Sequence, residues 1–359
     1  MSVAALSGPT LRPYRNLVTI LSLAGFLLFA ILLSAGKGAV PIAPGAFFAI
    51  LGNFVGLELP WAFTPREQTV LLAIRLPRVC LGILTGAGLA LAGATLQGLF
   101  RNPLADPALI GVSSGAALAA VSVIVFGGGA AAALPFLPQT WLLPLAAFAG
   151  GLGCTALVYR IANRGGRTDI PTMLLCGVAV NAIANAGMGL LIFLSDDQQL
   201  RDLNFWLLGS LGSVTWDKLL PVIPLAGLAI LLLPGFARFL NAMLLGEAEA
   251  HHLGYDVERE KRLAVLLAAL ATGAAVAVSG IIGFVGLVVP HLIRLLIGPN
   301  HVTLLPASAM LGAALMLIAD LVSRHIVLPA ELPIGIVTAC VGGPFFLWLL
   351  WRRRGIGGW

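Results

Sequence analysis

The chain has 359 residues, of which 59% are hydrophobic and only 10% are charged, and its formal net charge is +6. A soluble globular protein carries about 25% charged residues, so this composition excludes a soluble fold. Apolar blocks of roughly 20 residues recur without the residue-by-residue alternation of a membrane β-barrel. The sequence therefore predicts an all-α polytopic membrane protein with a single transmembrane domain over residues 1–359.

Ten apolar segments are predicted to cross the bilayer. The first follows Arg12 and Arg15, which is the order of a signal peptide, but we expect it to remain as an uncleaved span because the other spans need it for a consistent topology. Residues 203–211 are apolar but too short to cross, which predicts a helix at the interface. The predicted spans are residues 17–35, 75–99, 109–127, 140–160, 171–194, 219–237, 262–280, 284–298, 303–322 and 333–351.

Basic residues are unevenly divided between the two sides of this ten-span arrangement. With the N-terminus inside, 14 Lys and Arg residues lie on the inner side and 7 on the outer side. Because cytoplasmic loops carry the excess of positive charge, both termini are predicted to face the cytoplasm. The basic residues are scattered over short loops rather than gathered in one domain, which argues against nucleic acid as a partner.

Small residues repeat every four positions in three of the spans. Such stripes let helix backbones approach closely in lipid. Either static packing or a sliding interface along a pathway explains them. Irregular backbone is expected around residues 280–286, where three glycines precede Pro290. The stripes begin at Gly82, Gly111 and Gly335.

Charged residues gather at the predicted outer ends of the second and ninth spans. Arg75, Arg78 and Arg324 are either snorkelling anchors or a ring of cations suited to docking a carboxylate-bearing partner. An acid inside the membrane is a functional candidate by default. Asp320 is therefore a candidate proton site, although it could instead pair with Arg324 one helical turn away.

Two inner loops are candidates for moving parts. Asn102 and Leu104 lie between two prolines in residues 101–107, which suits a tight connection or an inner gate equally. The longest inner loop, residues 241–261, is either a solvated loop or a surface against which a cytoplasmic subunit pushes, and residues 258–262 are expected to be an ordinary charged helix start. The candidate residues in that loop are Leu245, Gly246, Glu247, Ala248, His251, Leu253 and Gly254.

Motifs of catalysis are missing from the sequence. It contains no GxxxxGK[ST], HExxH or GxSxG motif, and no catalytic residue is predicted. The four cysteines have no CxxC spacing and the histidines have no ligand spacing, so no metal site is expected. The chain is therefore predicted to be a transport subunit and not an enzyme.

Ordered segments along most of the chain resemble the permease family of bacterial ABC importers for iron-siderophores, haem and vitamin B12, the FecCD type. They include Phe284-Val285-Gly286-Leu287-Val288-Val289-Pro290-His291 and Glu331-Leu332-Pro333-Ile334-Gly335. The first 70 residues contribute least to the resemblance. The other matching segments are residues 75–78, 86–93, 101–107, 206–211, 245–254 and 342–346.

The resemblance implies a type II ABC importer permease fold of about ten helices, a homodimer and alternating access across the bacterial inner membrane. It also implies two ATP-binding subunits that hold ATP and Mg²⁺, with no cofactor on this chain, and a periplasmic binding protein. In the family, the arginines matching Arg75, Arg78 and Arg324 face the binding protein, the residues matching Asn102 and Leu104 close the inner gate, and the loop matching residues 245–254 couples to the ATPase.

The substrate is predicted from residues 196–206, which look most like haem permeases. A wide, mostly apolar passage suits haem, and Arg201 is the nearest cation for a propionate. Ferric siderophore and cobalamin are the alternatives, and a proton-coupled secondary transporter or a purely structural membrane scaffold are rivals from other classes. The candidate pathway residues are Met188, Leu191, Phe193, Arg201, Phe205 and Trp206.

Overall fold

The computed structural model describes residues 11–38, 40–133, 138–327 and 329–354, and most of these residues are helical. Among them, seven helices are long and apolar enough to cross a membrane. Each of the ten predicted spans coincides with a helix, so the all-α polytopic fold is confirmed. These helices are α1 (Leu11–Gly36), α4 (Leu76–Leu99), α5 (Val112–Ala133), α6 (Gln139–Ala162), α7 (Ile170–Phe193), α10 (Ile223–Leu232), α13 (Val257–Ser279), α14 (Val285–Ile297), α15 (His301–His325) and α16 (Ile334–Arg354).

Shorter elements connect the spans. A π-helical turn, Val70–Arg75, makes α3 and α4 one continuous helix from Pro65 to Leu99. Two 3₁₀ turns, Pro107–Ile110 and Leu233–Phe236, lead into α5 and α11. The other short elements are α2 (Pro44–Phe54), α3 (Pro65–Thr69), α8 (Asp197–Leu207), α9 (Trp216–Leu219), α11 (Ala237–Met243), α12 (Glu247–His252) and the antiparallel strands β1 (Asn163–Arg164) and β2 (Arg167–Thr168).

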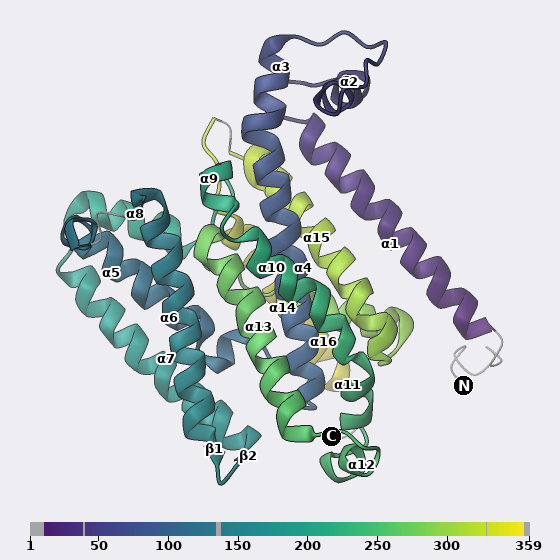
Figure 1. Cartoon of the computed structure of the whole chain (residues 1–359), viewed down its shortest axis with the longest axis vertical. Coiled ribbons are helices and arrows are strands. Elements are labelled where there is room, and N and C mark those ends of the chain that lie inside the picture. Colours follow the sequence, from purple (N-terminus) through teal and green to yellow (C-terminus); the bar gives the residue numbers. More distant parts are fainter. Residues whose placement is uncertain (1–10, 39, 134–137, 328, 355–359) are drawn as a thin grey trace.

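The short elements divide between two ends of the molecule (Figure 1). Helices α2, α3, α8 and α9 lie at the upper end, which we call the α2 end. The β1–β2 hairpin, α11 and α12 lie at the lower end, which we call the α12 end. The loops predicted on the outer side are thus at the α2 end and those predicted on the inner side are at the α12 end.

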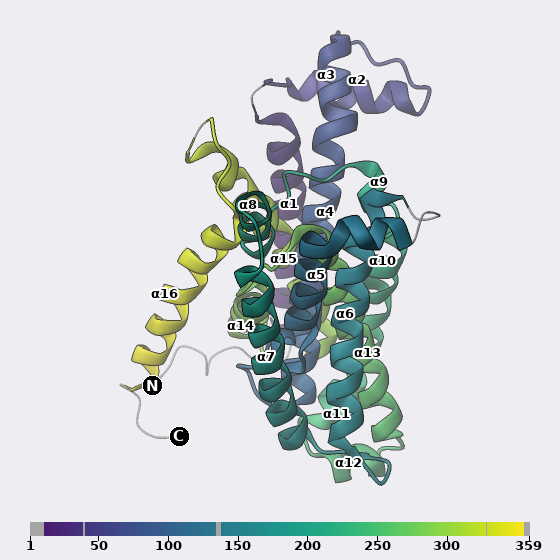
Figure 2. The same cartoon turned by 90° about the vertical axis from the view of Figure 1, so that its left-hand side faces the viewer.

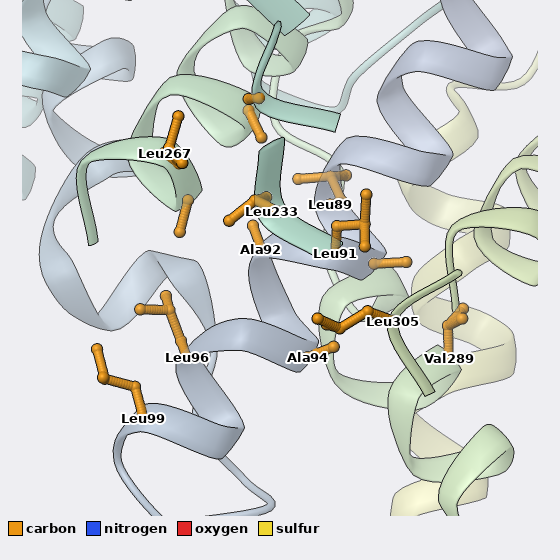
Figure 3. Packing of buried hydrophobic residues seen from close by; sticks show 14 of the residues in the cluster. Leu89, Leu91, Ala92, Ala94, Leu96, Leu99, Leu233, Leu267, Val289 and Leu305 are labelled. Carbon is orange, nitrogen blue, oxygen red and sulfur yellow. The ribbon is translucent and has the colours of Figure 1, made fainter. Parts of the chain in front are cut away.

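Helix α4 forms the centre of the fold. Within its most apolar window 83% of the residues are buried, against 11% in α1 and in α7. Its Leu89, Leu91 and Leu96 belong to the largest hydrophobic cluster, with residues of α13, α14 and α15 (Figure 3). Helices α7 and α16 stand at the margin instead: in Figure 2, α7 lies toward the viewer and α16 projects along the left edge.

The predicted small-residue stripes of α4 and α5 lie where helix backbones nearly touch, whereas Gly343 in the stripe of α16 has nothing within 4 Å of the position of a Cβ. A Cβ on Gly86 of α4 would lie 2.3 Å from the Gly312 oxygen of α15, and one on Gly93 would lie 1.9 Å from the Gly286 oxygen of α14. On α5, a Cβ on Gly115 would lie 2.4 Å from the Gly150 oxygen of α6. At these positions glycine is required by close packing in the centre of the molecule.

The interfacial helix differs from its prediction. Residues 203–211 were expected to form it, but α8 runs from Asp197 to Leu207. Asp196 and Gln199 form a capping box that starts the helix early. Gly209, with φ of 72°, leaves the helical region and ends it. Polar residues therefore make up much of a helix whose prediction rested on apolar residues alone.

The irregular backbone expected before Pro290 is present. Gly280 has φ of 70°, and Phe284, just before α14, has φ of 69°. A non-glycine residue rarely adopts this left-handed region. The break separates α13 from α14, as the run of glycines predicted.

Candidate functional site

A buried ion-pair cluster lies at the α2 end. Arg78 of α4 is 7% exposed and its Nε donates to the Asp320 Oδ1 of α15 at 3.0 Å. Its Nη1 and Nη2 donate to both carboxylate oxygens of Glu331, at 3.0 and 2.9 Å. This two-pronged geometry is the favoured one for a guanidinium and a carboxylate. Arg78 therefore ties α4 to α15 and to the segment that precedes α16.

The other two predicted docking arginines join the same cluster. Arg324 Nε lies 3.1 Å from Asp320 Oδ2, and its Nη2 donates to Ser34 Oγ at 3.0 Å. Arg75 Nη1 donates to the carbonyl oxygens of Ala35 and Gly36 at 2.6 and 2.8 Å, and Nη2 donates to that of Val40. A cation is stabilised at the C-terminus of a helix, so Arg75 caps α1.

The structure thus brings Arg75, Arg78 and Arg324 together, as the sequence predicted, and adds two carboxylates. Three guanidinium groups against two carboxylates leave one net positive charge. Asp320 pairs with Arg324 at the predicted spacing of one turn and also with Arg78. Both carboxylate oxygens of Asp320 therefore contact guanidinium groups, and the geometry gives no support to the proton-coupled alternative.

Helix α12 is a short surface helix between two glycines. Gly246 and Gly254 have φ of 134° and 91° and bound the helix at both ends. Ala250 is buried, whereas Leu245 and Leu253 are 68% and 62% exposed. Two exposed leucines beside a short helix at one end of the molecule suit contact with another protein.

Lys261 is a functional candidate that sequence reasoning missed, because it was expected to belong to an ordinary charged helix start. Its side chain is 1% exposed and its Nζ lies 2.7 Å from Glu247 Oε2 of α12 and 3.2 Å from Glu258 Oε1 of α13. Helical periodicity gave a weak indication that Lys261 is buried, since it lies one turn after Val257 and one turn before Val265, both of which are buried.

A groove of about 1000 Å³ opens at the α12 end. Its walls come from α12, the β1–β2 hairpin with the start of α7, and the end of α4. Glycines 165 and 166, with φ of 61° and 81°, form the hairpin turn. Arg101, Thr168, Glu247, Ala248, His251 and Glu258 are among the residues that line the groove.

The predicted gate residues lie in a tight loop between α4 and the 3₁₀ turn. Asn102 Oδ1 accepts a hydrogen bond of 2.9 Å from the Leu104 backbone N–H, and Arg101 has φ of 51°. Leu104 is 43% exposed. Burial raises the pKa of the Asp106 carboxyl, although the hydrogen bond from the Ala108 N–H acts in the opposite direction. The loop is thus held by its own hydrogen bonds, while the Leu104 side chain at its tip is accessible.

A buried hydrogen bond that the sequence did not predict links α4 to α14 near this loop. Gln97 Nε2 donates to the Gly286 carbonyl oxygen at 3.1 Å, and both Nη atoms of Arg294 donate to Gln97 Oε1 at 3.1 Å. Neither Gln97 nor Arg294 was singled out as a candidate from the sequence. Because 197 positions separate the two residues, no local sequence pattern indicated that they are in contact.

The predicted pathway residues lie on α7 and α8, and they differ in exposure. Phe193 and Phe205 are 83% and 60% exposed, and Arg201 is exposed with its Nη2 donating to Gln198 Oε1 at 2.8 Å. Met188 and Leu191 are half-buried. Trp206 is also half-buried and packs against a small cluster from α5, α6 and α13. Arg201 and Phe205 are one turn apart and share a face of α8.

Metal ligands do not gather in the part of the chain that the structure describes. There, no group of three His, Cys, Asp or Glu residues lies close enough to hold a metal ion. The four cysteines are free.

Known relatives cover nearly the whole chain. The hemin transport system permease protein HmuU of Yersinia pestis is 44% identical over 92% of this chain and 95% of its own length. The cobalamin import system permease protein BtuC of Halobacterium salinarum is 42% identical over 88% and 83%. The iron(3+)-hydroxamate import system permease protein FhuG of Bacillus subtilis is 37% identical over 92% and 96%.

A solved structure of an inward-facing metal-chelate type ABC transporter has a TM-score of 0.80 and 33% identity, covering 93% of this chain and 98% of that one. The relatives are named as permeases, which are transport components and not enzymes. With the FecCD transport family matched over residues 26–352, this chain belongs to that family, as a membrane permease subunit of an ABC importer.

Proposed function

We propose that the chain is one half of a homodimeric permease that moves haem from the periplasm to the cytoplasm by alternating access. This proposal rests on the presence of two different surfaces at opposite ends of the molecule. One end holds the arginine cluster and the other holds α12 and its groove. An importer needs a delivery surface on one side of the membrane and an energy-coupling surface on the other.

The α12 end is assigned to the cytoplasm and to the ATPase subunits, which hold ATP and Mg²⁺. Of the basic residues, 14 belong to the side that carries α12 and the termini, against 7 on the other side. Leu245, Ala248, His251 and Leu253 are exposed there for contact with a partner. Asn102 and Leu104 are assigned to the gate because their loop is accessible at the same end.

The α2 end is assigned to the periplasm and to the binding protein. Arg75, Arg78 and Arg324 supply a net positive cluster, which suits carboxylates on that partner. Because Arg75 and Arg78 are 4% and 7% exposed, part of their effect on docking is expected to be indirect, through the position of α1 and of the segment around Glu331.

Dimerisation is assigned to the side that carries α7 and α16. The two helices flank one face of the molecule in Figure 2. Both present exposed apolar side chains, such as Ile183 of α7 and Leu347 of α16, at 72% and 70%. A second copy placed on this face would enclose a pathway lined by Phe193, Arg201 and Phe205.

Haem is proposed as the substrate because Arg201 and Phe205 together suit it. An aromatic surface one turn from a cation fits a flat apolar ring that carries a carboxylate. The relative named for hemin transport is 44% identical, against 42% and 37% for those named for cobalamin and iron-hydroxamate. Ferric siderophore is the second candidate and cobalamin the third.

The test is ATP-dependent uptake into proteoliposomes that contain the permease, its ATPase and its binding protein. Hemin, a ferric hydroxamate siderophore and cyanocobalamin are supplied separately, each with and without ATP. Hemin is expected to be taken up fastest. Uptake of a siderophore without hemin uptake would refute haem as the substrate and leave the importer role intact.

The coupling role of α12 has its own test. Replacing His251, the fifth of the six residues of α12, by proline removes a backbone donor from the helix, whereas His251→Ala retains it. We expect H251P to hydrolyse ATP without matching transport, and H251A, which removes the imidazole but keeps the helix, to lose much less transport per ATP than H251P. Equal transport per ATP in H251P and H251A would refute the assignment of α12.

A further inference from the structure

Lys261 is a buried cation at the junction of three elements. It lies in α13, one turn from the first residue, and its side chain is 1% exposed. Exposed lysines usually keep their ammonium in water and bury only the stem. Here the whole side chain is enclosed, so its charge must be balanced by the groups around it.

Each partner of the ammonium comes from a different part of the chain. Glu247 Oε2 of α12 lies 2.7 Å from Nζ, and Glu258 Oε1 of α13 lies 3.2 Å from it. The third partner is the Thr168 carbonyl oxygen of β2, which accepts at 3.4 Å. Three acceptors match the three donors of an ammonium group.

Glu258 strengthens the link to the hairpin. Its Oε2 accepts a hydrogen bond of 2.9 Å from the Thr168 backbone N–H. Both backbone groups of Thr168 are therefore held by α13, one through Glu258 and one through Lys261. The next residue, Asp169, caps α7 by accepting from the Thr172 N–H at 2.9 Å. The start of α7 is thus fixed through two residues to α13.

Helix α12 depends on the same cation for its position. The helix has six residues, of which Ala250 is buried. A helix this short gains little stability of its own. The ion pair from Glu247 to Lys261 therefore supplies a directional contact that fixes α12 against α13. Glu247, Glu258 and Thr168 all line the groove at the α12 end.

We propose that Lys261 is a positioning residue that makes α12 and the start of α7 move together with α13. This inference rests on the proposed coupling role of α12. A displacement of α12 by an ATPase subunit would pull on Glu247, pass through Lys261 to Thr168, and reach α7, which we assigned to the pathway and the dimer face. A buried ion pair is weak evidence for net stability, and the role inferred for this one is to fix the relative positions of α12, β2 and α13.

The test compares Lys261→Met with Arg262→Met in the complete transporter. Methionine retains an unbranched apolar side chain and removes the charge. Arg262 is the next residue, is exposed, and among the described residues has no ion pair. We measure substrate molecules taken up per ATP hydrolysed in proteoliposomes, and amide hydrogen exchange over residues 247–253.

We expect K261M to assemble, to keep its ATPase rate within about twofold and to lose tenfold or more of its transport per ATP. Exchange over residues 247–253 should rise, whereas R262M should match the wild type in both measurements. The double variant K261M/E247Q should lose no more than K261M alone, because both changes break one link. Unchanged transport per ATP in K261M, or an equal loss in R262M, would overturn the proposal.

If K261M does not assemble, the same ratio is measured in Glu247→Gln, which retains the cation and one carboxylate. An unchanged ratio there overturns the inference as well. Failure of this inference is distinguishable from failure of the proposed function. If H251P uncouples transport while K261M and E247Q do not, α12 retains its role and Lys261 loses its own.

Discussion

Replacing Asp320 by asparagine tests the ion-pair cluster at the α2 end. Asp320 is 1% exposed and contacts Arg78 at 2.9 Å and Arg324 at 3.1 Å. Asparagine retains the shape of the side chain and removes its charge. Breaking a buried pair costs about 3–5 kcal/mol because it leaves an uncompensated buried charge. Arg78 retains Glu331 and Arg324 retains Ser34, so we expect the lower figure.

The expected loss corresponds to a measurable fall in melting temperature. For a chain of this length, about 3 kcal/mol at the midpoint lowers Tm by roughly 4 °C. A fluorogenic thiol dye reports unfolding in detergent, because Cys80, Cys154 and Cys176 are half-buried in the folded protein. Transport per ATP should be unchanged in D320N, because the role that we expect for this carboxylate is to hold α15 against α4.

Glu331→Gln is the control, because it removes a carboxylate that binds the same arginine but is more exposed to solvent. Glu331 is bound by the same Arg78, but its side chain is 45% exposed, and ion pairs in contact with solvent contribute about 0–1 kcal/mol. D320N should therefore lower Tm several times more than E331Q. Equal shifts in the two variants would refute the reasoning from burial, and loss of transport in a stable D320N would restore a role for Asp320 in the transport cycle.

Three further predictions concern the packing of α4 against α14, the substrate pathway and the proposed gate loop. Gly93→Ala should prevent assembly or lower Tm strongly, because its Cβ would lie 1.9 Å from the Gly286 oxygen. Gly153→Ala should be tolerated, because its Cβ would have nothing within 4 Å. Thermal melting of the two variants tests this difference. Arg201→Ala should slow hemin uptake several-fold and Arg201→Lys should retain most of it, since lysine keeps the charge; equal rates in the two would remove Arg201 from the pathway. Asn102→Ala should raise ATP-independent leak of substrate, because it removes the 2.9 Å bond that fixes the Leu104 backbone, and a leak-free N102A would refute the gate assignment.

Hydropathy predicted the spans because each one had to be apolar for its whole length. It missed α2, α9 and α11, which are too short to cross; the glycines at 246 and 254 instead marked the short α12. The i,i+4 spacing of Asp320 and Arg324 was readable from the sequence, and their pairing is confirmed. The bond between Arg78 and Glu331 joins residues 253 positions apart, and no local pattern could place them together. Lys261 was misjudged for the same reason, since two of its three partners lie outside its own helix.

The packing of the core indicates where movement can occur. Helix α4 cannot shift against α14 or α15 without collision, because glycines 86 and 93 leave no room between the backbones. Interfaces packed this closely do not deform continuously. Helices α7 and α16 have exposed apolar faces, but each also has one close backbone contact: a Cβ on Gly177 of α7 would lie 1.8 Å from the Leu109 oxygen, and one on Gly335 of α16 would lie 2.2 Å from the Leu208 oxygen. If the proposed alternating access occurs, we expect α7 to move together with Leu109 and α16 together with Leu208 around the centre of α4, α14 and α15. Lys261 lies where a push on α12 would reach α7.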